Sequence, residues 1–93
     1  MSTPVTVPVP VQPSAAIDSG RGRIDEIDAE IVRLVRERVE VSRQIQRARR
    51  LEGGPRIAQA RENEVVGRWS DELGAPGATV ALALLELSRG PLG

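Results

Sequence analysis

The chain has 93 residues, and its 13 basic side chains, all arginine, are balanced by 13 acidic ones. This neutrality argues against most nucleic-acid binders, which carry a basic surplus. The absence of cysteine and histidine argues against disulfides, thiolate metal sites and the usual triad enzymes, so we expect no metal. A domain this short covers only part of its apolar surface alone, so help from a second copy is expected.

The first 18 residues are rich in proline and valine and carry no charge before Asp18. Proline removes a backbone donor and fixes φ, so we predict a disordered or polyproline-like tail over residues 1–18. We find no basic leader followed by an apolar stretch, and no apolar run near the roughly 20 residues of a membrane span. We therefore expect a cytoplasmic protein that does not contact membranes.

Three later segments have the periodicity of helices. The first begins at Asp18 or Ser19 and runs to about residue 51, where the glycines and proline of EGGP end it. The second covers about residues 57–72 and has an apolar side. The third covers about residues 78–89 and is apolar on most of its circumference, so we expect it to be buried. No strand alternation and no repeat is present in the sequence.

The first segment predicts a helix near 45 Å long, at about 1.5 Å per residue. Apolar residues recur along it in steps of three and four, and two short helices can shield only part of them. This apolar stripe consists of Ile24, Ile27, Ile31, Leu34, Val41, Ile45 and Ala48. We predict an all-α fold over residues 19–93, with one long and two short helices, that forms a homodimer by antiparallel pairing of the long helices.

Charged residues interrupt the apolar faces. Arg38 takes a place within the apolar stripe, and Arg49 follows it by eleven residues, about 20° around and about 16 Å along a helix. On the second segment, Glu62 lies on the apolar side beside Arg61. The simplest interpretation is structural, with Arg38 snorkelling or setting register and Glu62 paired with Arg61, Arg38 or Arg49.

Taken together, the cations and the one acid suit a small dicarboxylate bearing a hydroxyl, because guanidinium groups bind carboxylates in bidentate pairs. Arg21 lies about 25 Å along the helix from Arg38, so it could serve the same ligand only from a partner chain. Without histidine or cysteine, the best-fitting chemistry is an intramolecular rearrangement driven by orientation and electrostatics.

Three segments of the sequence resemble those of a known family. RGRIDEIDAEIVRLVRERVEVSRQIQRAR, GGPRIAQAREN and LLELSRG are similar to the all-α class of chorismate mutases, in particular the short intracellular form of actinobacteria, over about residues 20–93. The resemblance implies an intertwined dimer with two active sites and no cofactor. It also implies conversion of chorismate to prephenate in phenylalanine and tyrosine biosynthesis.

The resemblance assigns roles to individual positions. Arg21 would reach one substrate carboxylate from the other protomer, Arg38 would grip the second carboxylate, and Arg49 would lie by the ether oxygen. Arg61 and Glu62 match an Arg-Glu pair in which the glutamate receives the ring hydroxyl.

The C-terminal segment departs from the common pattern. Ser88 would match a serine near a carboxylate, but Leu92 stands where the family usually has a glutamine or glutamate donor to the ether oxygen. The resemblance therefore implies a weak isolated enzyme that DAHP synthase activates by docking onto SRGPLG. Two alternatives stay open: a related enzyme acting on a chorismate analogue, and a non-catalytic helical dimerisation or regulatory module.

Overall fold

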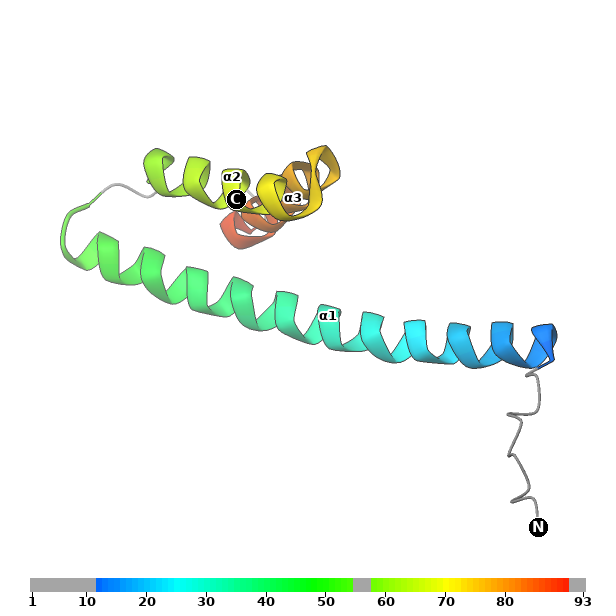
Figure 1. Ribbon diagram of the computed structural model, residues 1–93. Coiled ribbons are helices and arrows are strands. Elements are labelled where there is room, and N and C mark those ends of the chain that lie inside the picture. The colour runs from blue at the N-terminus through cyan, green and yellow to red at the C-terminus, as the bar shows by residue number, and fades with distance from the viewer. Residues whose placement is uncertain (1–11, 55–57, 91–93) are drawn as a thin grey trace, which may run out of the picture. The chain divides into compact units, whose positions relative to one another are not determined.

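A computed structural model describes residues 12–54 and 58–90, and this part of the chain forms three helices (Figure 1). Helix α1 covers Pro13–Leu51, α2 covers Gln59–Leu73 and α3 covers Ala75–Arg89. None of these described residues lies in a strand, so the predicted all-α fold of one long and two short helices is confirmed. Within the same ranges, no helix is long and apolar enough to cross a membrane.

Helix α1 begins at Pro13, ahead of the predicted start near residue 18. Proline is well tolerated in the first turn of a helix, because the N–H that it lacks would have no helical partner there. The carbonyl of Gln12 accepts the first bond, from the N–H of Ala16, at 2.9 Å. The predicted disordered or polyproline-like tail over residues 1–18 is therefore wrong for residues 13–18, which are helical. Residues 1–11 lie outside the described part of the chain, and their disorder stays a prediction.

The other end of α1 is closed by the predicted glycines. Gly53 has a φ of 76°. Its N–H donates to the carbonyl of Arg50 at 3.1 Å, while the N–H of Gly54 donates to that of Arg49 at 2.8 Å. This pair of bonds is the Schellman arrangement, which requires a left-handed residue that glycine adopts without strain. The motif fixes the last turn of α1, and with it the backbone of Arg49.

The chain divides into two compact units, Met1–Val32 and Arg33–Gly93, called here the N-terminal and the C-terminal unit; α1 runs through both. Every described residue of the N-terminal unit is exposed. The C-terminal unit contains all the residues that are buried in the described part of the chain, which are Val65, Gly77, Ala81, Leu84 and Ser88.

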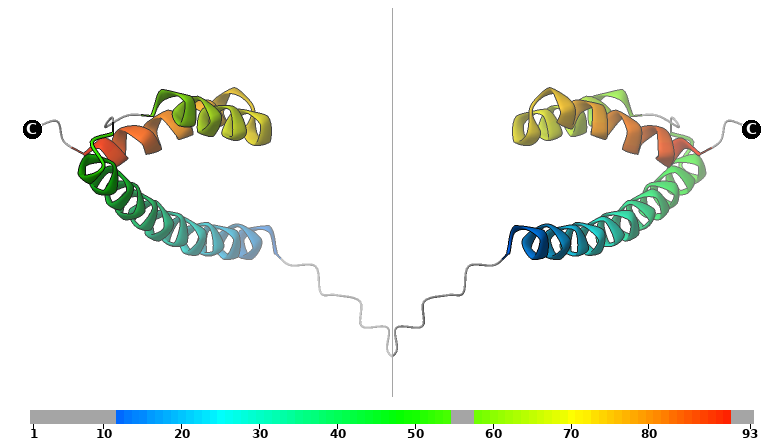
Figure 2. Two further views of the ribbon diagram at one scale, coloured as in Figure 1. Left: turned by 90° about the vertical axis from the view of Figure 1, so that its left-hand side faces the viewer. Right: turned by 90° about the vertical axis from the view of Figure 1, so that its right-hand side faces the viewer.

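Helices α2 and α3 pack side by side in the C-terminal unit (Figure 1 and Figure 2). Gly74 joins them with a φ of 76°, and its N–H donates to the carbonyl of Ser70 at 2.7 Å. At Gly77 the helices approach closely. A Cβ there would lie 2.8 Å from that of Leu73 and would overlap the carbonyl of Trp69. The contact therefore requires a residue without a side chain.

The short helices differ in how well their burial was predicted. On α2 the expected side is the less exposed one, because Val65 is buried and Val66 is half-buried. Helix α3 begins at Ala75 rather than near residue 78, since Pro76 suits its first turn. The expectation that α3 is buried around most of its circumference is wrong for the single chain: Leu82 stays 58% exposed, because the neighbouring helices cover one side only.

The face of α1 that meets the rest of the C-terminal unit is also not the predicted one. Leu34, Val41 and Ile45 of the apolar stripe stay about half exposed. The half-buried positions of α1 are Val35, Arg38, Val39, Ser42, Gln46 and Arg49. At about 100° per residue, the half-buried positions are centred about 90° around the helix from these three apolar residues. Arg38 and Arg49 lie on the border between the two faces. In the single chain, the apolar stripe is therefore only partly covered.

Candidate active site

A cleft of about 280 Å³ lies among the three helices of the C-terminal unit. Its volume is close to the lower bound of small-molecule sites, roughly 300 Å³. The lining consists of Arg38, Val41, Ser42, Ile45, Gln46, Arg49, Ala58, Arg61, Glu62, Val65, Leu85, Ser88 and Arg89. Four guanidinium groups and one carboxylate give this lining a formal charge of +3, so the cleft favours small anions.

The structure brings most of the predicted site residues together. Five of the six line the cleft, and they come from all three helices: Arg38, Arg49, Arg61, Glu62 and Ser88. Arg21 is not among the lining residues. It belongs to the N-terminal unit, where its side chain is exposed. The placement agrees with a shared site for the five, while the individual roles stay predictions.

Two arginines of α1 give the cleft its anion-binding character. Arg38 and Arg49 are both half-buried. Neither guanidinium group makes a hydrogen bond or an ion pair with any other residue in the part of the chain that the structure describes. A partly desolvated cation without a partner is unfavourable, and an anion in the cleft would relieve that cost.

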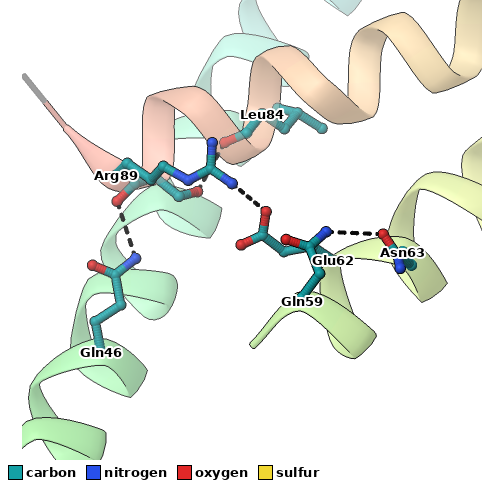
Figure 3. A network of polar contacts seen from close by, with 7 residues as sticks. Gln46, Gln59, Glu62, Asn63, Leu84 and Arg89 are labelled. Atoms are coloured by element: carbon teal, nitrogen blue, oxygen red, sulfur yellow. Dashed lines mark hydrogen bonds and ion pairs between the residues drawn. The ribbon is translucent and has the colours of Figure 1, made fainter. Parts of the chain in front are cut away.

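Glu62 supplies the acid of the cleft and sits in the first turn of α2, where the helix dipole favours a negative charge. Its side chain is 16% exposed. The sequence predicted Arg61, Arg38 or Arg49 as the partner of Glu62, and this prediction is wrong. Oε1 of Glu62 accepts a hydrogen bond from Nη2 of Arg89, at the end of α3 (Figure 3).

Arg61 is engaged elsewhere. Its Nη1 lies 3.3 Å from Oε1 of Glu64, one turn along α2, in an ion pair between two side chains that are more than half exposed. Such surface pairs contribute little to stability, on the order of 0–1 kcal/mol. Arg61 therefore remains able to exchange Glu64 for another anion at low cost.

Ser88 and Gln46 form a second polar link to the end of α3. Ser88 is 3% exposed, and its hydroxyl donates to the carbonyl of Leu84 at 2.9 Å. Its own carbonyl accepts a hydrogen bond from Nε2 of Gln46 at 3.3 Å (Figure 3). The hydroxyl proton is thus engaged within α3, so Ser88 could donate to a ligand carboxylate only by turning away from Leu84.

Sequence reasoning missed three polar residues of the lining: Ser42, Gln46 and Arg89. The first two follow Arg38 in steps of four, so they form a polar stripe beside the apolar one, and that periodicity could have indicated them. Arg89 gave no comparable signal. A cation at the end of a helix is favoured by the helix dipole alone, so nothing nearby indicated that it reaches Glu62.

No group of three or more histidine, cysteine, aspartate or glutamate side chains that could hold a metal ion occurs among residues 12–54 and 58–90. The polar groups that converge on the cleft are guanidinium, carboxylate, amide and hydroxyl groups. They can bind and orient an anion, and they can stabilise charge that develops on it.

Comparisons with known proteins agree with this picture. A family model for chorismate mutase type II matches residues 20–85. The intracellular chorismate mutase of Mycobacterium tuberculosis is 49% identical over 82 residues, which cover 88% of this chain and 77% of that protein. That of Mycolicibacterium smegmatis is 46% identical over 77 residues, covering 83% and 74% respectively.

A solved structure is similar as well. It is a non-covalent complex of DAHP synthase and chorismate mutase from Corynebacterium glutamicum with a bound transition state analog. The matching chain is 34% identical with a TM-score of 0.80, and the match covers 86% of this chain and 96% of that one.

Proposed function

The chain belongs to the chorismate mutase type II family, and on that premise we propose that its cleft converts chorismate to prephenate, on the way to phenylalanine and tyrosine. The observation that carries the proposal is the set of charges in the cleft. Arg38 and Arg49 are half-buried cations without partners in the described chain, and Glu62 is the acid beside them. A substrate with two carboxylates and a ring hydroxyl offers the complementary groups.

The reaction takes place within one molecule. The carbon–oxygen bond of the ether breaks while a new carbon–carbon bond forms, and no proton is transferred. Arg38 binds a carboxylate and holds the side chain over the ring, and Arg49 donates to the ether oxygen on which negative charge grows. Orientation of this kind contributes up to about 7–11 kcal/mol in favourable cases, so no covalent intermediate is needed.

The remaining groups of the cleft hold the ring. Glu62 accepts the ring hydroxyl through Oε2, because Oε1 is taken by Arg89. Arg61 leaves its surface partner to add to the binding of the substrate. Ser88 contributes from the end of α3, where its hydroxyl turns from the carbonyl of Leu84 to donate to a substrate carboxylate.

A second copy completes the site. We assign the other carboxylate of the substrate to Arg21 of the partner subunit in an intertwined homodimer, since Arg21 does not line the cleft of its own chain. The partly exposed apolar stripe supports this assembly: Ile24, Ile31 and Leu34 are 47–58% exposed. A continuous apolar surface of that kind indicates an interface. Sedimentation as a monomer at micromolar concentration would contradict the dimer.

The partner proposed for the C-terminal segment is DAHP synthase, as in the Corynebacterium glutamicum complex. Leu92 and its neighbours lie outside the described residues, so this assignment rests on the sequence SRGPLG and on the solved relative. Because a polar donor to the ether oxygen is replaced by leucine, the isolated enzyme should be slow. We also propose a cytoplasmic location, which is supported by the mycobacterial relatives named intracellular chorismate mutases.

One spectrophotometric assay tests the proposal. Chorismate loss is followed with the full chain alone and with the cognate DAHP synthase, and we expect slow turnover that the synthase accelerates. No turnover in either case, together with no binding of a bicyclic transition-state mimic, would leave the non-catalytic dimerisation module. Faster consumption of the 4-amino analogue or of isochorismate would identify an enzyme for a chorismate relative.

A further inference from the structure

The last turn of α3 is tied to both other helices by polar contacts. The guanidinium group of Arg89 binds the carboxylate of Glu62 on α2, and the carbonyl of the preceding residue, Ser88, accepts a hydrogen bond from Gln46 on α1 (Figure 3). The second contact satisfies one of the carbonyls that the end of a helix leaves without a helical partner. It thereby steadies the turn from which Arg89 extends.

The arginines of the cleft fall into two kinds. Arg38 and Arg49 have no partner in the described chain, so they are free to bind a ligand. Arg89 is already engaged with Glu62, and its side chain is 37% exposed. A carboxylate can accept at both oxygens, but the bond from Arg89 reaches Oε1 of Glu62, and no contact is marked at Oε2 (Figure 3).

We propose that Arg89 is a positioning residue that acts through Glu62. By holding Oε1, it fixes the carboxylate in one rotamer with Oε2 available to the cleft, where it accepts a hydroxyl group of the bound ring. This inference rests on the proposed function, and it adds a residue outside the set that the sequence indicated. Fixing a partly buried carboxylate in advance avoids the cost of ordering it when the substrate binds.

A double-mutant cycle tests the proposal on the full chain. Arg89→Ala should lower kcat/KM for chorismate by about 10- to 100-fold, as expected when a reacting group is misplaced. Glu62→Gln should lower it further. If Arg89 acts through Glu62, the double variant should match Glu62→Gln within about twofold. Arg89→Lys, which keeps the charge, should recover part of the loss.

The control is Arg47→Ala. Arg47 also pairs with a glutamate, Glu40, at 3.4 Å, but on the exposed surface of α1 and outside the cleft lining. The variant Arg47→Ala should therefore leave kcat/KM for chorismate unchanged. Should Arg89→Ala lose its helical circular dichroism, Arg89→Gln, which keeps most of the side-chain length, replaces it in the cycle.

Three outcomes would overturn the proposal. If the two single effects multiply in the double variant, Arg89 acts independently of Glu62. If Arg89→Ala leaves kcat/KM unchanged, no positioning is needed. If Arg89→Ala raises kcat/KM, the pair blocks Glu62 rather than orienting it.

A measurement without substrate separates this proposal from the proposed function. The carbon-13 resonance of the Glu62 carboxyl group, assigned by its loss in Glu62→Gln, should shift in Arg89→Ala and stay in place in Arg47→Ala. No shift in Arg89→Ala would overturn the positioning role even in an active enzyme. If the wild-type chain fails to consume chorismate, the proposed function fails, and this resonance still decides whether Arg89 holds Glu62.

Discussion

The two units of the chain reach the same secondary structure by different means. The C-terminal unit packs α2 on α3 around Val65, Ala81 and Leu84 and builds a charged cleft beside them. In the described part of the N-terminal unit every residue is exposed. Most helical stability in proteins comes from packing of an amphipathic face, and this part of α1 has no such packing in the single chain.

This difference indicates which apolar residues lack packing contacts in the single chain. The apolar residues of the N-terminal unit recur with the period of a buried face, yet Ile24 is 58% exposed and Ile27 is 41% exposed in the single chain. The sequence therefore predicts contacts that the single chain does not make. The C-terminal unit carries the proposed chemistry, and the N-terminal unit carries the proposed surface for another copy.

The largest expected effect lies in the C-terminal unit. Arg49→Ala removes the proposed donor to the ether oxygen, and losses of this kind reduce kcat by about 100- to 1,000-fold. KM should change much less, because the contact strengthens only as the bond breaks. Steady-state kinetics of chorismate loss measure both constants. Arg50→Ala is the matched control, since Arg50 is exposed and outside the cleft lining; an unchanged kcat in Arg49→Ala would exclude the role.

The next effect tests whether the N-terminal unit belongs to the site. Arg21→Ala should raise the barrier by about 2–3 kcal/mol, the cost of losing one partner of a close charge pair. Arg23→Ala is the control, because Arg23 is held at the surface by Glu26 at 3.0 Å. In a monomer, neither change would affect turnover.

Mixing the Arg21→Ala and Arg49→Ala variants tests whether the two units contribute to one site from different subunits. If each site combines Arg49 of one subunit with Arg21 of the partner subunit, a random mixture of Arg21→Ala and Arg49→Ala chains regains about a quarter of the wild-type activity, because half of the dimers carry one intact site. The activity is measured after subunit exchange at fixed total concentration. A mixture no more active than the separate variants would mean that both residues serve one site from one chain.

A smaller effect concerns the core of the C-terminal unit. Gly77→Ala forces a Cβ against the carbonyl of Trp69 and the side chain of Leu73, and overpacking of this kind costs about 1–3 kcal/mol of folding free energy. Thermal or urea unfolding followed by circular dichroism measures the loss. Gly67→Ala is the control within the same helix pair, because a Cβ at Gly67 would meet nothing within 4 Å apart from its chain neighbours and the backbone of its own helix.

The sequence was sufficient for the number and order of the helices and for the inward side of α2, because local periodicity and glycine breaks determine them. It was not sufficient to choose the face of α1 that meets α2 and α3. Two adjoining stripes compete there, one apolar and one carrying Ser42 and Gln46, and only tertiary packing decides between them. The pairing of Glu62 with Arg89 joins residues 27 positions apart, beyond the range of any local pattern.

The smallest predicted effect has the opposite sign to the one predicted for Gly77→Ala. Gly22 lies in the N-terminal unit, where a Cβ placed on it would meet nothing within 4 Å apart from its chain neighbours and the backbone of its own helix. It is about 160° around the helix from Ile24 and about 140° from Ile27, so a second copy covering the apolar stripe would still leave it free. Gly22→Ala should therefore raise the free energy of unfolding by about 0.5–1 kcal/mol, since alanine loses less backbone entropy in a helix. The unfolding midpoint at fixed chain concentration checks this, and a lower midpoint would mean that another chain packs on the side of α1 opposite the apolar stripe.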